Sequence, residues 1–400
     1  MTAPTEPADA ADRLGHERTF LRPTIASAGA LVAVALPSFM LGAFAPAIKD
    51  DLGFGDTALG ALFSLGYLLS AGGLQFGGAV ADREGPRRII RAGLVMASVG
   101  TVVIGGFADT YLVLLIGFSV VRIAEALVQP ATNTLISVSV PVPRRGIAMG
   151  TKQAAIPLAT TLSGLAVPLL GDSIGWEGSF LCVAVVSGAA WVAMPGAPSP
   201  HRHRRRSQRV LWRVPHLRLL AAAGACGAAS VVAVAGFLTT AAIEAGYSED
   251  SAGLLLTLGG LIMIVSRLSW GLLADRFAFD RFAAVGAAIG LGAMSYLLFA
   301  TESKPLLVVG TVLVFGIGWS WPGLMILGII EHHPDQPGAA SAVLQTGVRL
   351  GALVSPIAFG ALADTAGFRV AWFLPFGFAM VATVLMLAGA RAAARSAHSP

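Results

Sequence analysis

A polar stripe crosses one of the apolar parts of the chain. Arg122, Glu125, Gln129 and Asn133 follow one another at steps of three and four residues within the apolar segment 111–138. Such steps place side chains on one face of a helix. A buried carboxylate beside an arginine can release or capture a proton when their contact changes. The stripe therefore predicts either a structural ion pair between Arg122 and Glu125 or a site for an anion and a proton.

A second arginine lies in the apolar segment 339–362. Gln345 and Arg349 are four residues apart there, so they share a helical face. No acidic residue of the same segment is close enough to neutralise Arg349. Either this guanidinium pairs with Glu125 or with backbone carbonyls, or it lines a cavity.

Two further residues could contribute to a site. Trp319 lies in 316–323, where glycines and Pro322 weaken a helix, and a break at that depth is tolerated where it faces protein or a cavity. Arg267 lies eight residues before Asp275, about 12 Å along a helix, so its side chain can reach the nearer membrane surface or serve a gate. Lys152 is expected at the same surface, with Gln153 facing the cavity.

The expected charge inside the membrane is positive. Arg122, Arg267 and Arg349 stand against Glu125 alone, a net charge of +2 from three cations and one carboxylate. Unpaired positive charge in a medium of low dielectric constant favours a negatively charged solute. Glu125 is the candidate for coupling a proton to its movement.

The elements that position these residues are membrane helices. Hydrophobic residues make up 55% of the 400, charged residues only 12%, and mean hydropathy is +0.75. A soluble domain carries about 25% charged residues. Twelve apolar segments are long enough to span a bilayer as helices: 24–48, 57–80, 89–107, 111–138, 147–170, 179–194, 219–243, 251–273, 282–300, 306–330, 339–362 and 370–387.

The chain also repeats itself. Gly53, Gly60 and Gly66 recur as Gly246, Gly253 and Gly259, each 193 positions later. Gln153 recurs as Gln345, and Gly175-Trp176 as Gly367-Phe368, each 192 positions later. Two related halves commonly hold a substrate between them and alternate its access by rocking. We therefore predict an all-α membrane protein of two pseudo-symmetric six-helix bundles.

Basic residues set the expected orientation. With a cytoplasmic N-terminus, 21 of the 27 Lys and Arg face the cytoplasm, three face outward and three lie within spans. This predicts two cytoplasmic termini in a cell membrane. The expected parts are a tail at 1–22, a bundle at 23–195, a basic linker at 196–217, a bundle at 218–390 and a tail at 391–400.

The loop between the second and third spans carries the strongest local motif. It reads Gly78-Ala-Val-Ala-Asp82-Arg83-Glu-Gly85-Pro-Arg87-Arg88, and a degenerate copy stands at Gly271, Asp275 and Arg276. This motif resembles the signature of the major facilitator superfamily, and Arg122 to Ala126 resembles that family's span-four motif. The resemblance implies twelve spans, alternating access, and a gate formed by these loop residues. A faint similarity to the cyanate-permease and anion-symporter branches comes from 152–176.

The combined interpretation is a secondary transporter for a small organic or inorganic anion, with a proton as the candidate coupling ion. Arg122, Glu125, Gln129, Gln345, Arg349 and Trp319 are the expected substrate-binding residues. No phosphate-binding glycine loop, metal cluster or nucleophile motif is present, so we expect no enzyme, cofactor, metal or nucleic-acid partner. We expect a monomer in the lipid bilayer. A proton-coupled exporter of hydrophobic compounds and a membrane sensor on a transporter scaffold remain as alternatives.

Overall fold

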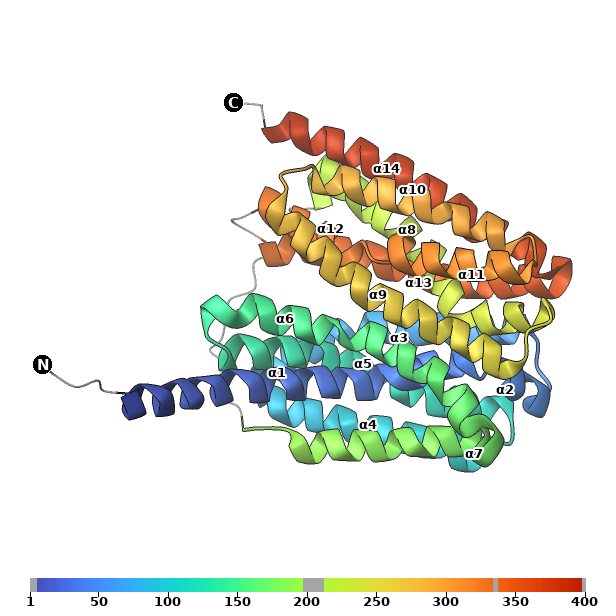
Figure 1. Cartoon of the computed structure of the whole chain (residues 1–400), viewed down its shortest axis with the longest axis horizontal. Coiled ribbons are helices and arrows are strands. Elements are labelled where there is room, and N and C mark those ends of the chain that lie inside the picture. Colours follow the sequence, from blue (N-terminus) through green and yellow to red (C-terminus); the bar gives the residue numbers. More distant parts are fainter. Residues whose placement is uncertain (1–5, 197–211, 334–336, 398–400) are drawn as a thin grey trace, which may run out of the picture.

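The computed structural model describes residues 6–196, 212–333 and 337–397. Within them, the side chains of 6–20, 73–79, 81, 82, 142, 275, 337–339, 396 and 397 lie outside the description. Every described element is helical. Both ends of the chain lie at the same end of the molecule, which we call the termini face; the opposite end is the distal face (Figure 1).

The first half contains seven α-helices and one short 3-10 turn. They are α1 (Glu6–Ala43), α2 (Ala45–Leu52), α3 (Asp56–Glu84), α4 (Pro86–Phe107), α5 (Tyr111–Ser139), η1 (Val142–Arg144), α6 (Arg145–Gln153) and α7 (Ala155–Ala193). The first expected span, 24–48, is interrupted at Phe44, because Pro46 stands in the first turn of a new helix. Helix α1 also extends back into the expected tail.

The second half repeats this arrangement. It contains α8 (Pro215–Glu244), α9 (Glu249–Arg276), α10 (Arg281–Phe299), α11 (Lys304–Leu313), the π-helical turn η3 (Val314–Gly318), α12 (Pro322–His332), α13 (Pro337–Ala371) and α14 (Phe373–Ala397). The break expected at 316–323 is confirmed, since η3 and a turn separate α11 from α12. Helix α8 begins inside the expected linker, most of which lies outside the described residues.

The described helices account for twelve passages across a membrane. Ten are long and apolar enough, or eleven if α2 and α3, which meet at 115°, form one span. The segment Arg145–Ala193 provides the additional passage, because its 49 residues turn back at Gly175. Gly175 has φ 68° and its repeat partner Gly367 has φ 80°, a backbone region that favours glycine. The same turn thus joins the last two spans of each half.

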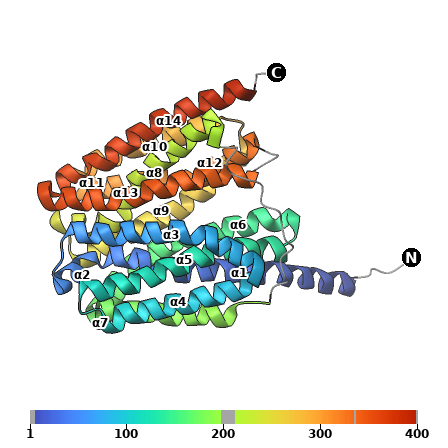
Figure 2. The same cartoon turned by 180° about the vertical axis from the view of Figure 1, so that it is seen from behind.

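The two halves lie side by side along the long axis of the molecule (Figures 1 and 2). Helix α3 packs on α13, and α7 packs on α9. Repeated glycines allow both contacts: the α-carbon of Gly60 faces the carbonyl of Pro356, and Gly253 faces the carbonyl of Gly164, with no room for a side chain. The duplicated sequence therefore builds two equivalent seams between the halves.

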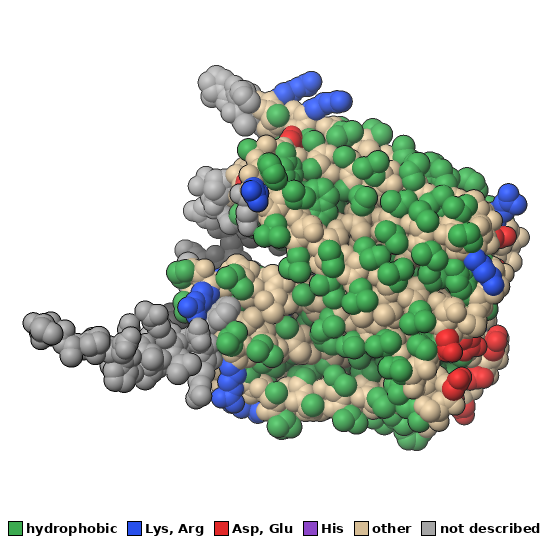
Figure 3. All heavy atoms as spheres, in the orientation of Figure 1, with side chains coloured by type: hydrophobic (Ala, Val, Ile, Leu, Met, Phe, Trp, Pro, Cys, Tyr) green, Lys and Arg blue, Asp and Glu red, His purple; other side chains and the backbone are tan. Residues whose placement is uncertain are grey.

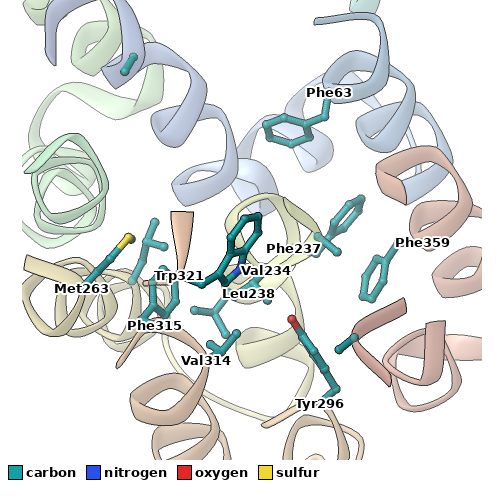
Figure 4. Close-up of a cluster of buried hydrophobic side chains, with 14 of the residues drawn as sticks. Phe63, Val234, Phe237, Leu238, Met263, Tyr296, Val314, Phe315, Trp321 and Phe359 are labelled. Atoms are coloured by element: carbon teal, nitrogen blue, oxygen red, sulfur yellow. The ribbon is translucent and has the colours of Figure 1, made fainter. Parts of the chain in front are cut away.

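The core and the outer surface divide the apolar side chains between them. Trp321, Phe315, Val234 and Phe237 gather in the second half, and Phe63 of the first half points toward them (Figure 4). On the outside, the face in Figure 3 is hydrophobic across its middle, with charged side chains toward the two ends. Such a belt fits the hydrocarbon core of a bilayer.

Candidate functional site

Arg122 is held at the junction of three helices of the first half. Its side chain is 6% exposed, forms an ion pair with Glu125, and donates a hydrogen bond of 3.0 Å to the hydroxyl of Ser38 on α1. The guanidinium carbon lies 4.8 Å from the ring centre of Tyr67 on α3, a cation–π contact. Gly66 makes this placement possible, since a β-carbon there would lie 2.9 Å from Cγ and Nε of Arg122. Arg122 and Glu125 are thus in contact, as both sequence interpretations require, and the choice between a structural pair and a site stays open.

Arg349 reaches from the second half to the polar stripe of the first. Its Nη2 donates a hydrogen bond of 3.2 Å to Oε1 of Gln129. Among the described residues, no carboxylate lies within ion-pair distance of Arg349, and Glu125 is paired with Arg122 instead. Among the described residues the guanidinium is therefore hydrogen-bonded but forms no ion pair.

Lys152 was expected at the membrane surface, and its depth in a membrane stays a prediction, but its side chain is buried within the protein. Its side chain is 2% exposed and turns back toward α5, where Nζ donates to Oδ1 of Asn133 and, at 3.3 Å, to the carbonyl oxygen of Gln129. The described residues include no carboxylate in ion-pair contact with it. Burial of an ammonium group without a counter-charge is costly, and inside a membrane it usually marks function.

The stripe on α5 therefore gathers three cations from three helices. Arg122 of α5 meets Glu125, Arg349 of α13 meets Gln129, and Lys152 of α6 meets Asn133 and Gln129. Sequence periodicity placed four of these residues on one face but could not identify Lys152 as a partner. One signal in the sequence could have pointed to such a partner: Asn133 is an amide within an apolar segment, so its side chain needs a hydrogen-bond partner there.

The remaining two candidates occupy different positions. Gln345 is exposed on α13, one turn before Arg349. Trp319 is half-buried, with its ring centre 5.4 Å from that of Phe315 and 6.5 Å from that of Phe39. Phe39 directly follows Ser38, the hydrogen-bond partner of Arg122. An aromatic cluster of Phe39, Phe315 and Trp319 thus lies beside the charged stripe.

The loop motif is only partly described. Gly85 has φ 88° and precedes α4, while Arg83 is exposed and Arg87 is half-buried. In the second copy, Arg276 ends α9 and Gly271 has open space around it. Gly78 is described only by its helical backbone, and the side chains of Asp82 and Asp275 lie outside the described residues.

Arg267 joins the two halves toward the termini face. Its Nη1 donates a hydrogen bond of 3.2 Å to the carbonyl oxygen of Gln153 at the end of α6. The contact involves one side chain and one carbonyl, and the role of Arg267 stays a prediction.

The distal face is closed by a contact that the sequence did not indicate. Asp364 of α13 accepts hydrogen bonds of 2.8 and 2.7 Å from the backbone N–H groups of Asp56 and Thr57, the first two residues of α3. The ammonium of Lys49 lies 2.6 Å from Asp56. A carboxylate at a helix N-terminus is favourable because it satisfies free N–H groups and meets the positive end of the helix dipole.

Comparison with known proteins agrees with this architecture. The sequence model of the Major Facilitator Superfamily matches residues 27–347 and 220–400. An MFS-type efflux pump of Mycolicibacterium smegmatis is 28% identical over 91% of this chain and 90% of its own. A probable sulfoacetate transporter, SauU, of Cupriavidus necator is 25% identical over 87% of each chain.

Solved transporter structures have the same fold. A bacterial homolog of the human lysosomal transporter Spinster superposes with a TM-score of 0.75 at 15% identity, covering 96% of this chain and 99% of that one. A variant of the nucleoside transporter NupG gives 0.77 at 12% identity, covering 93% and 99%. At these identities the likeness concerns the fold alone. With twelve passages in two repeated halves and a family match along nearly its whole length, the chain belongs to the Major Facilitator Superfamily of membrane transporters.

Proposed function

We propose that this transporter moves a small organic or inorganic anion through a site between its two halves. One observation carries the proposal: Arg349 lies against the polar stripe of the opposite half, and none of the described carboxylates forms an ion pair with it. A cation held in this way is stabilised by an anionic ligand that completes its hydrogen bonds. The proposed substrate-binding residues are Arg122, Glu125, Gln129, Gln345, Arg349 and Trp319.

Glu125 is the proposed proton carrier. In the present state its carboxylate is paired with Arg122. When a substrate draws Arg122 away, the carboxylate loses its counter-charge and takes up a proton, because an uncompensated charge is costly at that depth. Substrate and proton would then occupy the site together.

The proposed cycle is alternating access in a cell membrane, with both termini in the cytoplasm. In that orientation the distal face is extracellular, and the present state is closed on that side by Asp364 and by the glycine contacts of α3 with α13. The gate motif at Gly78, Asp82, Arg83, Gly85 and Arg87, with its second copy at Gly271, Asp275 and Arg276, is proposed to act at the cytoplasmic side.

Uptake into proteoliposomes tests this function. The purified protein is reconstituted and offered a panel of radiolabelled anions with and without a pH gradient, and we expect saturable, gradient-dependent uptake of at least one. Arg349→Ala is expected to abolish that uptake. Arg369→Ala is the matched control, because Arg369 is an exposed residue of the same helix, and it should leave uptake unchanged. Equal loss in both variants, or anion uptake that survives Arg349→Ala, would overturn the proposal.

A second candidate is proton-coupled export of hydrophobic compounds. It is favoured by the aromatic cluster of Phe39, Phe315 and Trp319 and by the similarity to an efflux pump. Export of a cationic dye does not need an uncompensated arginine. Dye efflux that persists in Arg349→Ala and fails in Trp319→Ala would favour this candidate over anion transport.

A further inference from the structure

We infer that Lys152 is a substrate-binding residue and that the site takes an anion with two negative charges. The inference rests on the proposed function, because it concerns the same site. It starts from Lys152, whose ammonium is buried in the protein yet meets only neutral oxygens among the described residues.

The first argument is the charge of the occupied stripe. The side chains that meet on α5 are three cations, Arg122, Arg349 and Lys152, and one carboxylate, Glu125. While Glu125 is ionised and paired with Arg122, two positive charges remain; a dianion matches both, whereas an anion of charge −1 leaves one unmatched in a medium that stabilises ions poorly. Once Glu125 has taken up a proton the unmatched cations are three, and a dianion again leaves one fewer of them unmatched than a monoanion does.

The second argument is where the two unmatched cations lie. Arg349 bonds the side-chain oxygen of Gln129, and Lys152 bonds the main-chain oxygen of the same residue. They therefore approach the same residue of α5 from opposite halves, Arg349 on α13 and Lys152 on α6. A short molecule with an acidic group at each end can contact both, and each neutral oxygen is then replaced by a charged acceptor, which forms the stronger hydrogen bond.

The third argument concerns conformational coupling. Because the two cations belong to different halves, a dianion between them ties the halves together, while a monoanion can stay with one half. Binding energy that depends on bringing the halves together is what allows a ligand to shift the equilibrium between two states.

The competing explanation is that Lys152 only fastens α6 to α5 through Asn133 and Gln129. A fastening residue affects all substrates alike and lowers the stability of the empty protein. A substrate-binding residue changes the preference between dianions and monoanions. The two roles are thus separated by comparing ligands of equal skeleton and different charge.

The experiment measures ligand binding to the full chain in lipid nanodiscs, by thermal shift and by competition. The probes are three pairs of equal skeleton, each a monoanion and a dianion: propionate with malonate, butyrate with succinate, and ethanesulfonate with sulfoacetate. We expect at least one dianion to bind about tenfold or more tightly than its monoanion, the factor typical of one additional hydrogen bond between charged groups. Lys152→Met should remove this advantage and leave monoanion affinity within about twofold.

Three controls make the result decisive. Lys304→Met replaces an exposed lysine on the distal side and should keep the preference for dianions. Lys152→Arg retains the charge, should keep much of the preference, and is measured if Lys152→Met does not fold. Arg349→Gln should weaken both classes of anion.

The outcomes separate the inference from the function on which it rests. Monoanions and dianions that bind equally well in the unaltered protein, or a preference that survives Lys152→Met, would overturn the dianion inference while anion transport stands. Equal loss of both classes in Lys152→Met assigns a fastening role and also overturns it. Absence of binding by every anion, with dye export intact, would overturn the proposed function itself.

Discussion

Helices α3 and α9 begin at equivalent places in the two halves, and their first turns are stabilised by different means. Ser248 precedes α9, and its hydroxyl accepts a hydrogen bond of 3.3 Å from the N–H of Ser251. The equivalent residue before α3, 193 positions earlier, is Gly55, which has no side chain to offer. Asp364 of the other half takes its place, and a β-carbon at Gly55 would lie 3.0 Å from the carboxylate oxygens of Asp364.

The difference concerns whether the first turn of a helix depends on the contact between the two halves. A cap made by the preceding residue persists in every conformation of the helix. A cap supplied by the other half persists only while the halves are together at the distal face. Separation of the halves at the distal face would therefore remove the cap of α3 and leave the cap of α9 in place.

A second pair of equivalent residues, Gly66 and Gly259, has different neighbours in the two halves. Gly66 leaves room for Arg122, and Gly259, its repeat partner, leaves room for the ring of Phe315. Arg122 and Phe315 are themselves 193 positions apart. One half thus uses the space for a charge and the other for an apolar ring, so the polar stripe belongs to the first half alone.

The largest expected effect comes from filling these two spaces. Gly66→Ala should displace Arg122 and reduce anion uptake by about tenfold or more, because a misplaced charged hydrogen bond costs at least that factor. Gly259→Ala, whose β-carbon would meet the ring of Phe315, should mainly lower stability, by about 1–3 kcal/mol for overpacking. Uptake per folded molecule and thermal unfolding are measured on both variants. Equal loss of uptake in the two would contradict the assigned difference.

A smaller effect is expected from the inter-half cap. Asp364→Asn keeps the shape but loses the negative charge, and a lost cap costs about 1 kcal/mol, or about a fivefold shift toward distal opening. Distances between spin labels at Asp109 and Glu302, near the distal ends of the two halves, would report that shift in a protein lacking Cys182 and Cys226. Ser248→Ala should lose a similar amount of stability without lengthening those distances. If it lengthens them equally, the two caps have the same role.

The smallest effect tests whether a local cap can replace the distant one. Gly55→Ser gives α3 the residue type that precedes α9, and it crowds the carboxylate of Asp364. In a double-mutant cycle on the same spin-label distances, Asp364→Asn should shift the equilibrium less in Gly55→Ser than in the unaltered protein, by a few tenths of a kcal/mol. Strict additivity of the two changes would show that Asp364 acts by some means other than capping.

Much of the fold could be predicted because it depends on the type and spacing of residues close together in the sequence. Apolar length indicated the spans, glycine and proline indicated the break near Trp319, and spacing placed Arg122 and Glu125 on one face. The contacts that were missed join distant parts of the chain. Asp364 meets residues 307 and 308 positions away, and Lys152 meets Gln129 and Asn133 on a preceding helix. Periodicity tells which face a residue occupies, but the partner on that face depends on how helices pack.

With the proposed site, the cations that meet at α5 would also make the transporter responsive to membrane voltage. An elementary charge crossing the whole membrane field gains or loses about 2.3 kcal/mol per 100 mV. An empty site with a net charge of +2 feels that field as the halves rock, whereas a site that holds a dianion and a protonated Glu125 has a net charge of +1 and feels less of it. The potential would then act on the return of the unloaded protein, and a cell could set its turnover through the electrical state of its membrane.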